Sequence, residues 1–222
     1  MYPRGHVFQG NIYGTYYKII VYAPKIGINA MSLESKITDE LNRIDAVFSN
    51  YSNDSQLYLF NQHQLTEPIP VHVDIWQMVQ RSYGYYDQMS GYWDPTIMRL
   101  SQFYGLQSSI KNTNKDTTNT QSNGQSNVDL MLNLSDVKNA VGLNLIESLP
   151  NHYLKKKSPL VTLDVSSIAK GYAVDRVIDI INTHWVTCAY VDIGGDVRVF
   201  GSKPNNEVWR IGIASPAQPS EL

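Results

Sequence analysis

Cysteine is nearly absent from this sequence of 222 residues, since Cys188 is the only one. A single cysteine excludes an internal disulfide framework and a metal site built on a Cys-x-x-Cys motif. Because Cys188 lies in an apolar run typical of a β-strand, we expect it to be a small buried hydrophobic residue. The chemistry of the protein must therefore be sought in other side chains.

Long apolar runs are lacking too. No run reaches the length of about 18 apolar residues that a transmembrane helix needs, so we expect no membrane span in the chain. The first residues, MYPRGHVFQG, lack the apolar core of a signal peptide. A mature form whose export signal has been removed is compatible with both observations.

The chain also has no excess of one charge, with 18 Lys and Arg, 20 Asp and Glu and a formal net charge of -2. No basic stripe runs along a candidate helix, so we expect no nucleic-acid partner. The one basic run, 155–157, is interpreted as a solvated turn. With 42% hydrophobic residues, the chain can bury a substantial core.

The apolar pattern predicts strands and helices that alternate. After an extended start, residues 12–24 are typical of a β-strand. Apolar residues spaced by three and four predict an amphipathic helix over 31–48 and a second helix before the Ser90-Gly91 turn. Residues 107–127 are nearly all small or polar, which indicates a disordered or surface insertion without function.

The second half continues in the same way. Residues 160–165 (LVTLDV) and 207–216 (EVWRIGIASP) are predicted as strands, and two further apolar runs flank Gly194-Gly195. Between residues 160–165 and the glycine pair a helix is predicted. Its apolar face is made of Ile168, Ala169, Tyr172, Ala173, Val177, Ile178 and Ile181. Because strands and helices are intermingled and no repeat is present, the predicted class is α+β (mixed α/β).

The stretch LDVSSIAKG holds the most chemically informative residues. Asp164 stands at the end of a predicted strand, Ser166 and Ser167 where a helix N-cap belongs, and Lys170 in the first turn. Free amides, the helix dipole and an ammonium favour an anion. The Asp164 carboxylate would repel a bound phosphate, unless it accepts hydrogen bonds from N-H groups of the ligand or helps to place a cation. A hydrogen-bond acceptor beside an anion site therefore suits a nucleotide better than a simple phosphate. The alternative is an ordinary capped helix with an exposed lysine.

Five stretches, taken in order, resemble the ApbE family, the flavin transferases that move FMN from FAD onto a threonine of a target protein. They are Gly14-Thr15, FSNYSNDSQLYLFN (48–61), GYWDPTI (91–97), SSIAKGYAVDR (166–176) and VDIGGDVRVFGSKP (191–204) followed by WRIGI. The resemblance covers about 11–216. It implies a single T-fold-related domain over 1–222, with mixed sheets and packed helices.

The resemblance also implies site residues. FAD contacts are implied for Tyr13, Tyr51, Tyr92, Trp93, Asp94, Asp164 and Lys170, and a magnesium ligand for the Ser167 carbonyl. The family usually has methionine where Tyr13 stands, so that contact involves a different side chain. Simpler alternatives remain: Tyr51 as a surface-turn tyrosine, Asp94-Pro95 as a turn, and Gly194-Gly195 as a plain hairpin turn.

One family segment has no counterpart. A His-Ile-x-Asp-Pro-x-Thr-Gly segment supplies further magnesium ligands and a candidate catalytic base, and no histidine of this chain stands in one. The histidines are His6, His63, His72, His152 and His184. We therefore expect the catalytic base to lie beyond Leu222 and the domain to be incomplete at its C-terminus. The chain as it stands would lack part of its metal site, and we expect it to be inactive for that reason.

The implied activity is magnesium-dependent transfer of FMN from FAD to a threonine hydroxyl of an acceptor protein, with release of AMP. The implied acceptor is a subunit of a membrane redox complex, and the implied location is outside the cytoplasm, often as a lipoprotein. Alternatives are a magnesium-dependent FAD pyrophosphatase that releases FMN and AMP, a non-catalytic FAD-binding protein, and a structural domain that binds no nucleotide.

Overall fold

The computed structural model describes residues 4–23, 29–106 and 133–213. The predicted insertion at 107–127 lies outside these residues. The chain divides into two compact units: unit 1 comprises residues 1–45 and 168–222, and unit 2 comprises residues 46–167. Each unit is described by itself.

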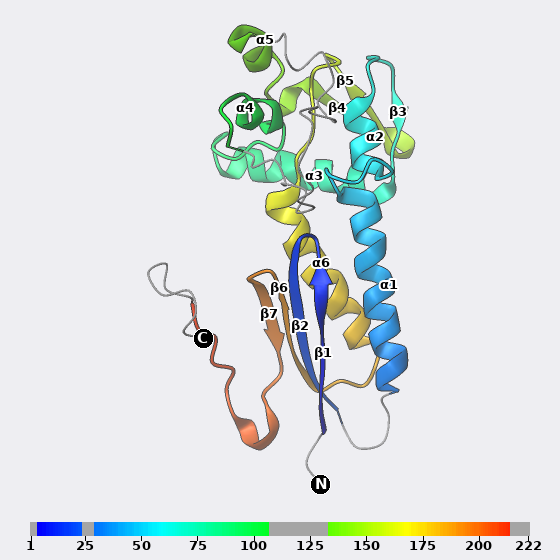
Figure 1. Cartoon of the computed structure of the whole chain (residues 1–222), viewed down its shortest axis with the longest axis vertical. Coiled ribbons are helices and arrows are strands. Elements are labelled where there is room, and N and C mark those ends of the chain that lie inside the picture. Colours follow the sequence, from blue (N-terminus) through cyan, green and yellow to red (C-terminus); the bar gives the residue numbers. More distant parts are fainter. Residues whose placement is uncertain (1–3, 24–28, 107–132, 214–222) are drawn as a thin grey trace, which may run out of the picture. The chain divides into compact units, whose positions relative to one another are not determined.

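Unit 1 contains a four-stranded antiparallel sheet in the order β1-β2-β6-β7 (Figure 1). Its strands are β1 (Arg4–Ile12), β2 (Thr15–Ala23), β6 (Cys188–Ile193) and β7 (Asp196–Phe200). The expected strand over 12–24 is therefore β2 together with the last residue of β1. Tyr13 and Gly14 separate the two strands, because their φ angles of 54° and 71° reverse the chain.

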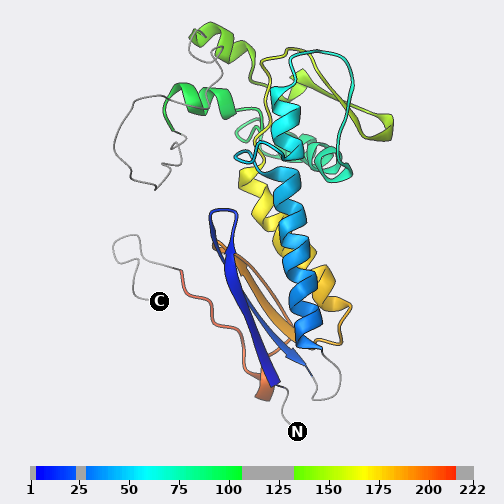
Figure 2. The same cartoon turned by 45° about the vertical axis from the view of Figure 1, so that its right-hand side comes forward.

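Two helices lie along one face of this sheet in both views (Figures 1 and 2). They are α1 (Ala30–Phe48) and α6 (Ser166–Asn182), and they confirm the helices predicted over 31–48 and around 168–181. On β2, Ile19, Val21 and Ala23 are buried in alternation. The helices bury Leu33, Ile37, Leu41, Ile44, Val177, Ile178 and Ile181. Each large apolar side chain so buried contributes about 1.5 to 3 kcal/mol.

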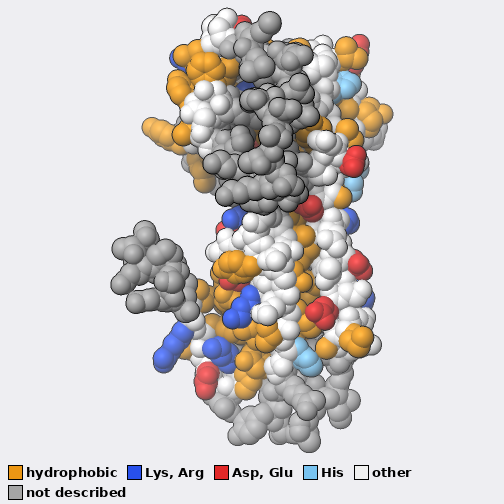
Figure 3. All heavy atoms as spheres, viewed as in Figure 1, with side chains coloured by type: hydrophobic (Ala, Val, Ile, Leu, Met, Phe, Trp, Pro, Cys, Tyr) orange, Lys and Arg blue, Asp and Glu red, His pale blue; other side chains and the backbone are white. Residues whose placement is uncertain are grey.

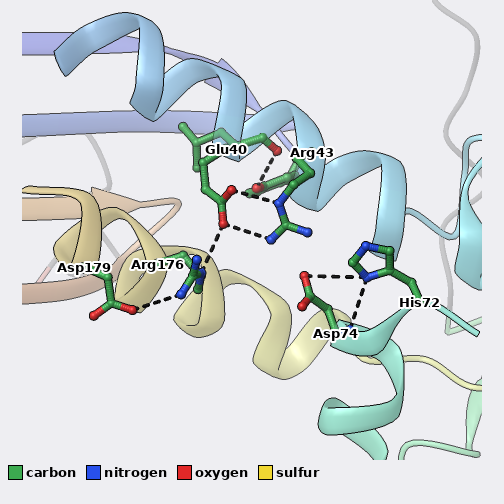
Figure 4. A network of polar contacts seen from close by, with 8 residues as sticks. Glu40, Arg43, His72, Asp74, Arg176 and Asp179 are labelled. Atoms are coloured by element: carbon green, nitrogen blue, oxygen red, sulfur yellow. Dashed lines mark hydrogen bonds and ion pairs between the residues drawn. The ribbon is translucent and has the colours of Figure 1, made fainter. Parts of the chain in front are cut away.

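Polar contacts join the same two helices (Figure 4). The Glu40 carboxylate of α1 accepts hydrogen bonds from Arg43 at 2.8 Å and from Arg176 of α6 at 3.1 Å. The hydrogen bond from Arg43, and then that from Arg176, lowers the pKa of Glu40 although burial opposes the shift. Arg176 also pairs with Asp179 at 3.2 Å. The ion pair between Glu40 and Arg176 therefore links α1 to α6.

Unit 2 combines short helices with a second antiparallel sheet in the order β3-β5-β4. Its helices are α2 (Gln56–Gln62), α3 (Val73–Gln88), α4 (Met98–Phe103) and α5 (Leu134–Asn139), and its strands are β3 (Ile69–Pro70), β4 (Ile146–Leu149) and β5 (Tyr153–Lys156). Helix α3 confirms the second predicted helix. It begins at a His72 cap, whose Nδ1 accepts the Asp74 N-H (Figure 4). It is followed by Ser90 and Gly91 with positive φ.

Three sequence-based predictions were wrong. Residues 161–165 form no strand, because the Leu163 backbone pairs with a side chain of another segment. Residues 207–213 form no strand either: Trp209 stacks on Tyr190, with ring centroids 5.7 Å apart, and Ile213 is exposed. The lysine run is not a solvated turn, since Lys156 ends β5 and is fully buried.

The combination of helices with antiparallel sheets confirms the α+β class. Cys188 is buried, as expected. Within residues 4–23, 29–106 and 133–213, no helix has the length and apolarity needed to cross a bilayer.

Candidate functional site

Three of the stretches that carry the family resemblance meet around Asp164 in unit 2. The Asp164 N-H donates to the Pro95 carbonyl at 2.6 Å, which joins the GYWDPTI stretch to the chain before α6. The Asn50 amide donates to the Asp164 carboxylate at 3.1 Å, which adds the 48–61 stretch. The Trp93 indole N-H donates to the Ser167 hydroxyl at 3.0 Å. Segments far apart in the sequence thus form one cluster.

The Asp164 carboxylate is placed at the start of α6. Its Oδ1 accepts the N-H of Ser166 at 2.9 Å. Ser166 and Ser167 are exposed residues of the first turn, so the prediction that they occupy the N-cap position was wrong. Lys170 is the fifth residue of α6 and begins its second turn rather than standing in its first. The amides at this terminus, with the helix dipole behind them, suit an anion.

The loop that carries Tyr51 is fixed by serine hydroxyls. Ser49 Oγ accepts the N-H groups of Tyr51 at 3.3 Å and of Ser52 at 3.2 Å. The buried Ser55 hydroxyl donates to the Ser49 carbonyl and accepts the Tyr58 N-H, which caps α2. The Tyr51 side chain remains 68% exposed. Its backbone is held while its ring is accessible to a ligand.

Two more predicted site aromatics follow one another at the cluster. The Tyr92 side chain is 96% exposed. Trp93 is half-buried, and its ring meets Tyr85 edge-on, with the centroids 5.9 Å apart. Flat accessible rings of this kind offer stacking surfaces for the bases or flavin of a nucleotide.

The Asp94 side chain is engaged in holding the backbone. Its Oδ1 accepts the N-H and the hydroxyl of Thr96 at 2.8 and 2.6 Å, and its Oδ2 accepts the Leu143 N-H at 3.2 Å. These contacts support the simpler interpretation, in which Asp94-Pro95 is a turn. A contact between Asp94 and FAD stays a prediction.

Unit 1 gathers the remaining stretches at two hairpin turns. The Gly194 N-H donates to the Tyr16 carbonyl at 2.9 Å, so the β6–β7 turn lies beside the β1–β2 turn. Gly194 has a φ of 56°, and a Cβ there would lie 2.6 Å from the Thr15 methyl group. Only glycine satisfies both constraints. The Lys170 ammonium reaches this turn, 3.4 Å from the Gly194 carbonyl and 4.0 Å from the Asp196 carboxylate.

Tyr13 lies at the tip of the first of these turns. Its hydroxyl donates to the Leu41 carbonyl of α1 at 2.9 Å. Burial, and then the charges of Asp45 and Glu40, raise the pKa of Tyr13, so the phenol stays neutral. The contact with the flavin that the resemblance implies for Tyr13 stays a prediction.

Sequence reasoning missed a buried carboxylate beneath the glycine turn. Asp192 accepts the Tyr190 hydroxyl at 3.0 Å, the Tyr16 hydroxyl at 3.4 Å and the Gly195 N-H at 3.0 Å. Burial and then the Asp192 carboxylate raise the pKa of Tyr190 to about 12. The presence of a charged residue inside the apolar run AYVDI could have indicated the role of Asp192. Sequence reasoning also missed Asn50 and Asn61 of the 48–61 stretch, which contact Asp164 and the Leu163 backbone.

The described residues do not complete a magnesium site. No group of three Asp, Glu, His or Cys residues capable of holding a metal ion occurs in this part of the chain. Magnesium in proteins prefers six oxygen ligands and takes several of them from water and substrate phosphates. The Ser167 carbonyl alone does not define such a site.

The fold is shared with solved flavin transferase structures. The structure matches "Flavin Transferase ApbE from Vibrio cholerae" with a TM-score of 0.79 and 24% identity over 96% of this chain and 65% of that one. It matches the apo form of the Pseudomonas stutzeri flavinyl transferase ApbE with a TM-score of 0.80 and 24% identity, over 97% of this chain and 64% of that one.

The sequence comparisons define the family. The sequence model described as "ApbE family" matches residues 13–222. The chain therefore belongs to the ApbE family. It is 27% identical to the FAD:protein FMN transferase of Vibrio cholerae over 94% of this chain, and 28% identical to that of Haemophilus influenzae over 96%. It spans 58% and 59% of the length of these relatives.

Proposed function

We propose that this protein is an FAD:protein FMN transferase. The observation that supports this most is the family match over residues 13–222, which includes both residue clusters described above. Because the chain spans 58% of the Vibrio cholerae relative, the activity, the substrates and the partner all belong to the proposal.

Each cluster offers groups suited to part of FAD. In unit 2, the Asp164 carboxylate would accept N-H groups of the ligand, and the exposed Tyr51 and Tyr92 rings would stack on its aromatic systems. In unit 1, the half-exposed Lys170 ammonium would neutralise pyrophosphate charge, since an ammonium on a flexible stem suits phosphate as a point charge.

The proposed reaction transfers the FMN phosphoryl group. The hydroxyl oxygen of an acceptor threonine forms a bond to the FMN phosphorus, the pyrophosphate bond to AMP breaks, and AMP leaves. The hydroxyl proton passes to a general base. Positioning and electrostatics supply most of the catalysis in such transfers. Magnesium, when bound, neutralises charge on the pyrophosphate, and the Ser167 carbonyl would be one of its ligands.

The acceptor and the location belong to the same proposal. The proposed acceptor is a subunit of a membrane redox complex. The proposed location is outside the cytoplasm, where the protein would be anchored as a lipoprotein. The family resemblance alone supports these two points.

The test is coexpression with a candidate redox-complex subunit in cells without their own flavin transferase. Flavin fluorescence of the subunit in a denaturing gel, lost when its target threonine is replaced by alanine, is the expected result. Purified protein incubated with FAD and Mg²⁺ distinguishes the alternatives. Release of free FMN and AMP in the absence of an acceptor would identify a pyrophosphatase. Binding of FAD with no release of AMP under any condition would identify a non-catalytic FAD-binding protein.

A further inference from the structure

Asn61, at the end of α2, is bonded to the backbone beside Asp164. Its side-chain oxygen accepts the Leu163 N-H at 2.7 Å, and its amide donates to the Leu163 carbonyl at 2.8 Å. The Asn61 side chain thus takes the place of a neighbouring strand. It is only 5% exposed, so loss of these bonds would leave buried backbone groups unpaired.

This pairing fixes which way the Asn61 amide faces. A backbone N-H only donates and a backbone carbonyl only accepts, so the oxygen and nitrogen of Asn61 cannot be exchanged. The second N-H of the same amide points to Asn50 Oδ1, at 3.2 Å. Asn50 therefore has its oxygen towards Asn61 and its own NH₂ group on the other side.

The NH₂ group of Asn50 meets Asp164 as a consequence. It donates to Oδ1 at 3.1 Å, the oxygen that also accepts the Ser166 N-H at 2.9 Å. Two donors on the same oxygen restrict rotation of the carboxylate, and they thereby also restrict the position of its second oxygen.

We propose that Asn61 and Asn50 are positioning residues that orient the Asp164 carboxylate for FAD. The hydrogen bonds run from the Leu163 backbone to the Asn61 amide, then to the Asn50 amide and then to the Asp164 carboxylate. Each group determines whether the oxygen or the nitrogen of the next amide points towards it. The ligand in this inference rests on the proposed function. The orientation of Asp164 rests on the hydrogen bonds alone.

The test replaces the donor of Asn50 without changing its shape. Asn50→Asp keeps an acceptor for Asn61 and places a second carboxylate against Asp164. Asn53→Asp adds the same charge at an exposed position of the same loop and serves as the control. Dissociation constants for FAD are measured from flavin fluorescence at pH 7.5 and pH 5, with melting curves to verify folding.

At pH 7.5 we expect Asn50→Asp to bind FAD about tenfold more weakly, and Asn53→Asp within about twofold of the unsubstituted chain. The difference should shrink at pH 5, where paired carboxylates share a proton. In an Asp164→Ala background, Asn50→Asp should have no further effect. A weakening of the same size in both backgrounds, or none in either, would overturn the proposal.

If the unsubstituted chain binds no FAD, the proposed function and the ligand assigned to Asp164 fail. The side-chain NMR signals of Asn50 then test the orienting contact by itself. We expect them to differ between the unsubstituted chain and Asp164→Ala, and to stay the same in Asp54→Ala, which removes an exposed carboxylate of the same loop. Identical Asn50 signals in the unsubstituted chain and Asp164→Ala would overturn the contact.

Discussion

The Lys170 ammonium lies 3.4 Å from the Gly194 carbonyl oxygen, so α6 reaches the turn between β6 and β7. That turn is itself held from below by the buried Asp192, which accepts the Gly195 N-H. The lysine that the family resemblance assigns to FAD is thus placed by a backbone group of a turn that only glycine can form. The geometry of the turn and the position of the lysine should change together.

The turn can be tested with Gly194→Ala. The new Cβ would lie 2.6 Å from the Thr15 methyl group at a φ of 56°, so we expect the free energy of unfolding to fall by about 1 to 3 kcal/mol. Urea denaturation measures it.

Gly84→Ala is the matched control. Gly84 lies inside α3 with no atom near its would-be Cβ, so alanine should raise the free energy of unfolding by up to about 1 kcal/mol. Equal effects of the two substitutions would contradict the assignment.

Asp192→Asn tests the carboxylate beneath the turn. With the negative charge removed, the pKa of Tyr190 should fall from about 12, though not to its ordinary value because burial is the larger cause of the shift. Ultraviolet titration of tyrosine ionisation measures the change, and Tyr190→Phe identifies the titrating group. An unchanged Tyr190 titration would show that Asp192 does not hold the hydroxyl.

Lys156 should make stability depend on pH in the alkaline range. Burial, and then the charge of Arg99, lower its pKa from 10.5 to about 8. Between these values the unfolded chain binds more protons than the folded one, so the free energy of unfolding should rise with pH, by about 1 to 3 kcal/mol. Lys156→Met should remove this rise. Lys155→Met, in the same strand, should keep it, and loss of the rise in both variants would argue against the assignment.

Glu40 should contribute at the acid end. Its pKa lies below the ordinary 4.5, so its stabilisation is present above that pH and lost as pH falls through the folded-state value. We expect Glu40→Gln to lower the free energy of unfolding by about 1 kcal/mol at pH 7 and to differ less from the unsubstituted chain near pH 3. Exposed Glu34→Gln is the control. A deficit that is equal at both pH values would mean that the ion pairs contribute nothing.

Apolar periodicity was sufficient for the three long helices α1, α3 and α6, but it did not predict the short helices α2, α4 and α5. The three- and four-residue spacing around Leu33, Ile37 and Leu41 predicted α1, because one face of that helix is buried against a sheet. The apolar run around Leu163 was wrongly predicted as a strand, because its buried side chains accompany a backbone that bonds to Asn61. Periodicity reports burial, and it cannot tell a neighbouring strand from a side chain that replaces one.

The candidate site was predictable only in part. The stretches with Asp164 and Lys170 were found from their family pattern, and the structure joins them to other stretches of that pattern. Asn50, Asn61 and Asp192 were missed, because each bonds to a partner that is distant in sequence. These partners are Asp164, the Leu163 backbone and Tyr16. The burial of Lys156 was missed for the same reason, because the distant backbone carbonyls of Phe60 and Asn61 accept its ammonium protons.

FAD binding is the central claim, and titration of this chain with FAD, with and without Mg²⁺, followed by flavin fluorescence, tests it most directly. The account predicts saturable binding that is weakened by about tenfold or more in an Asp164→Ala, Lys170→Ala double variant that still folds. Equal FAD affinity of the double variant and the unsubstituted chain, or no binding by either, would contradict it.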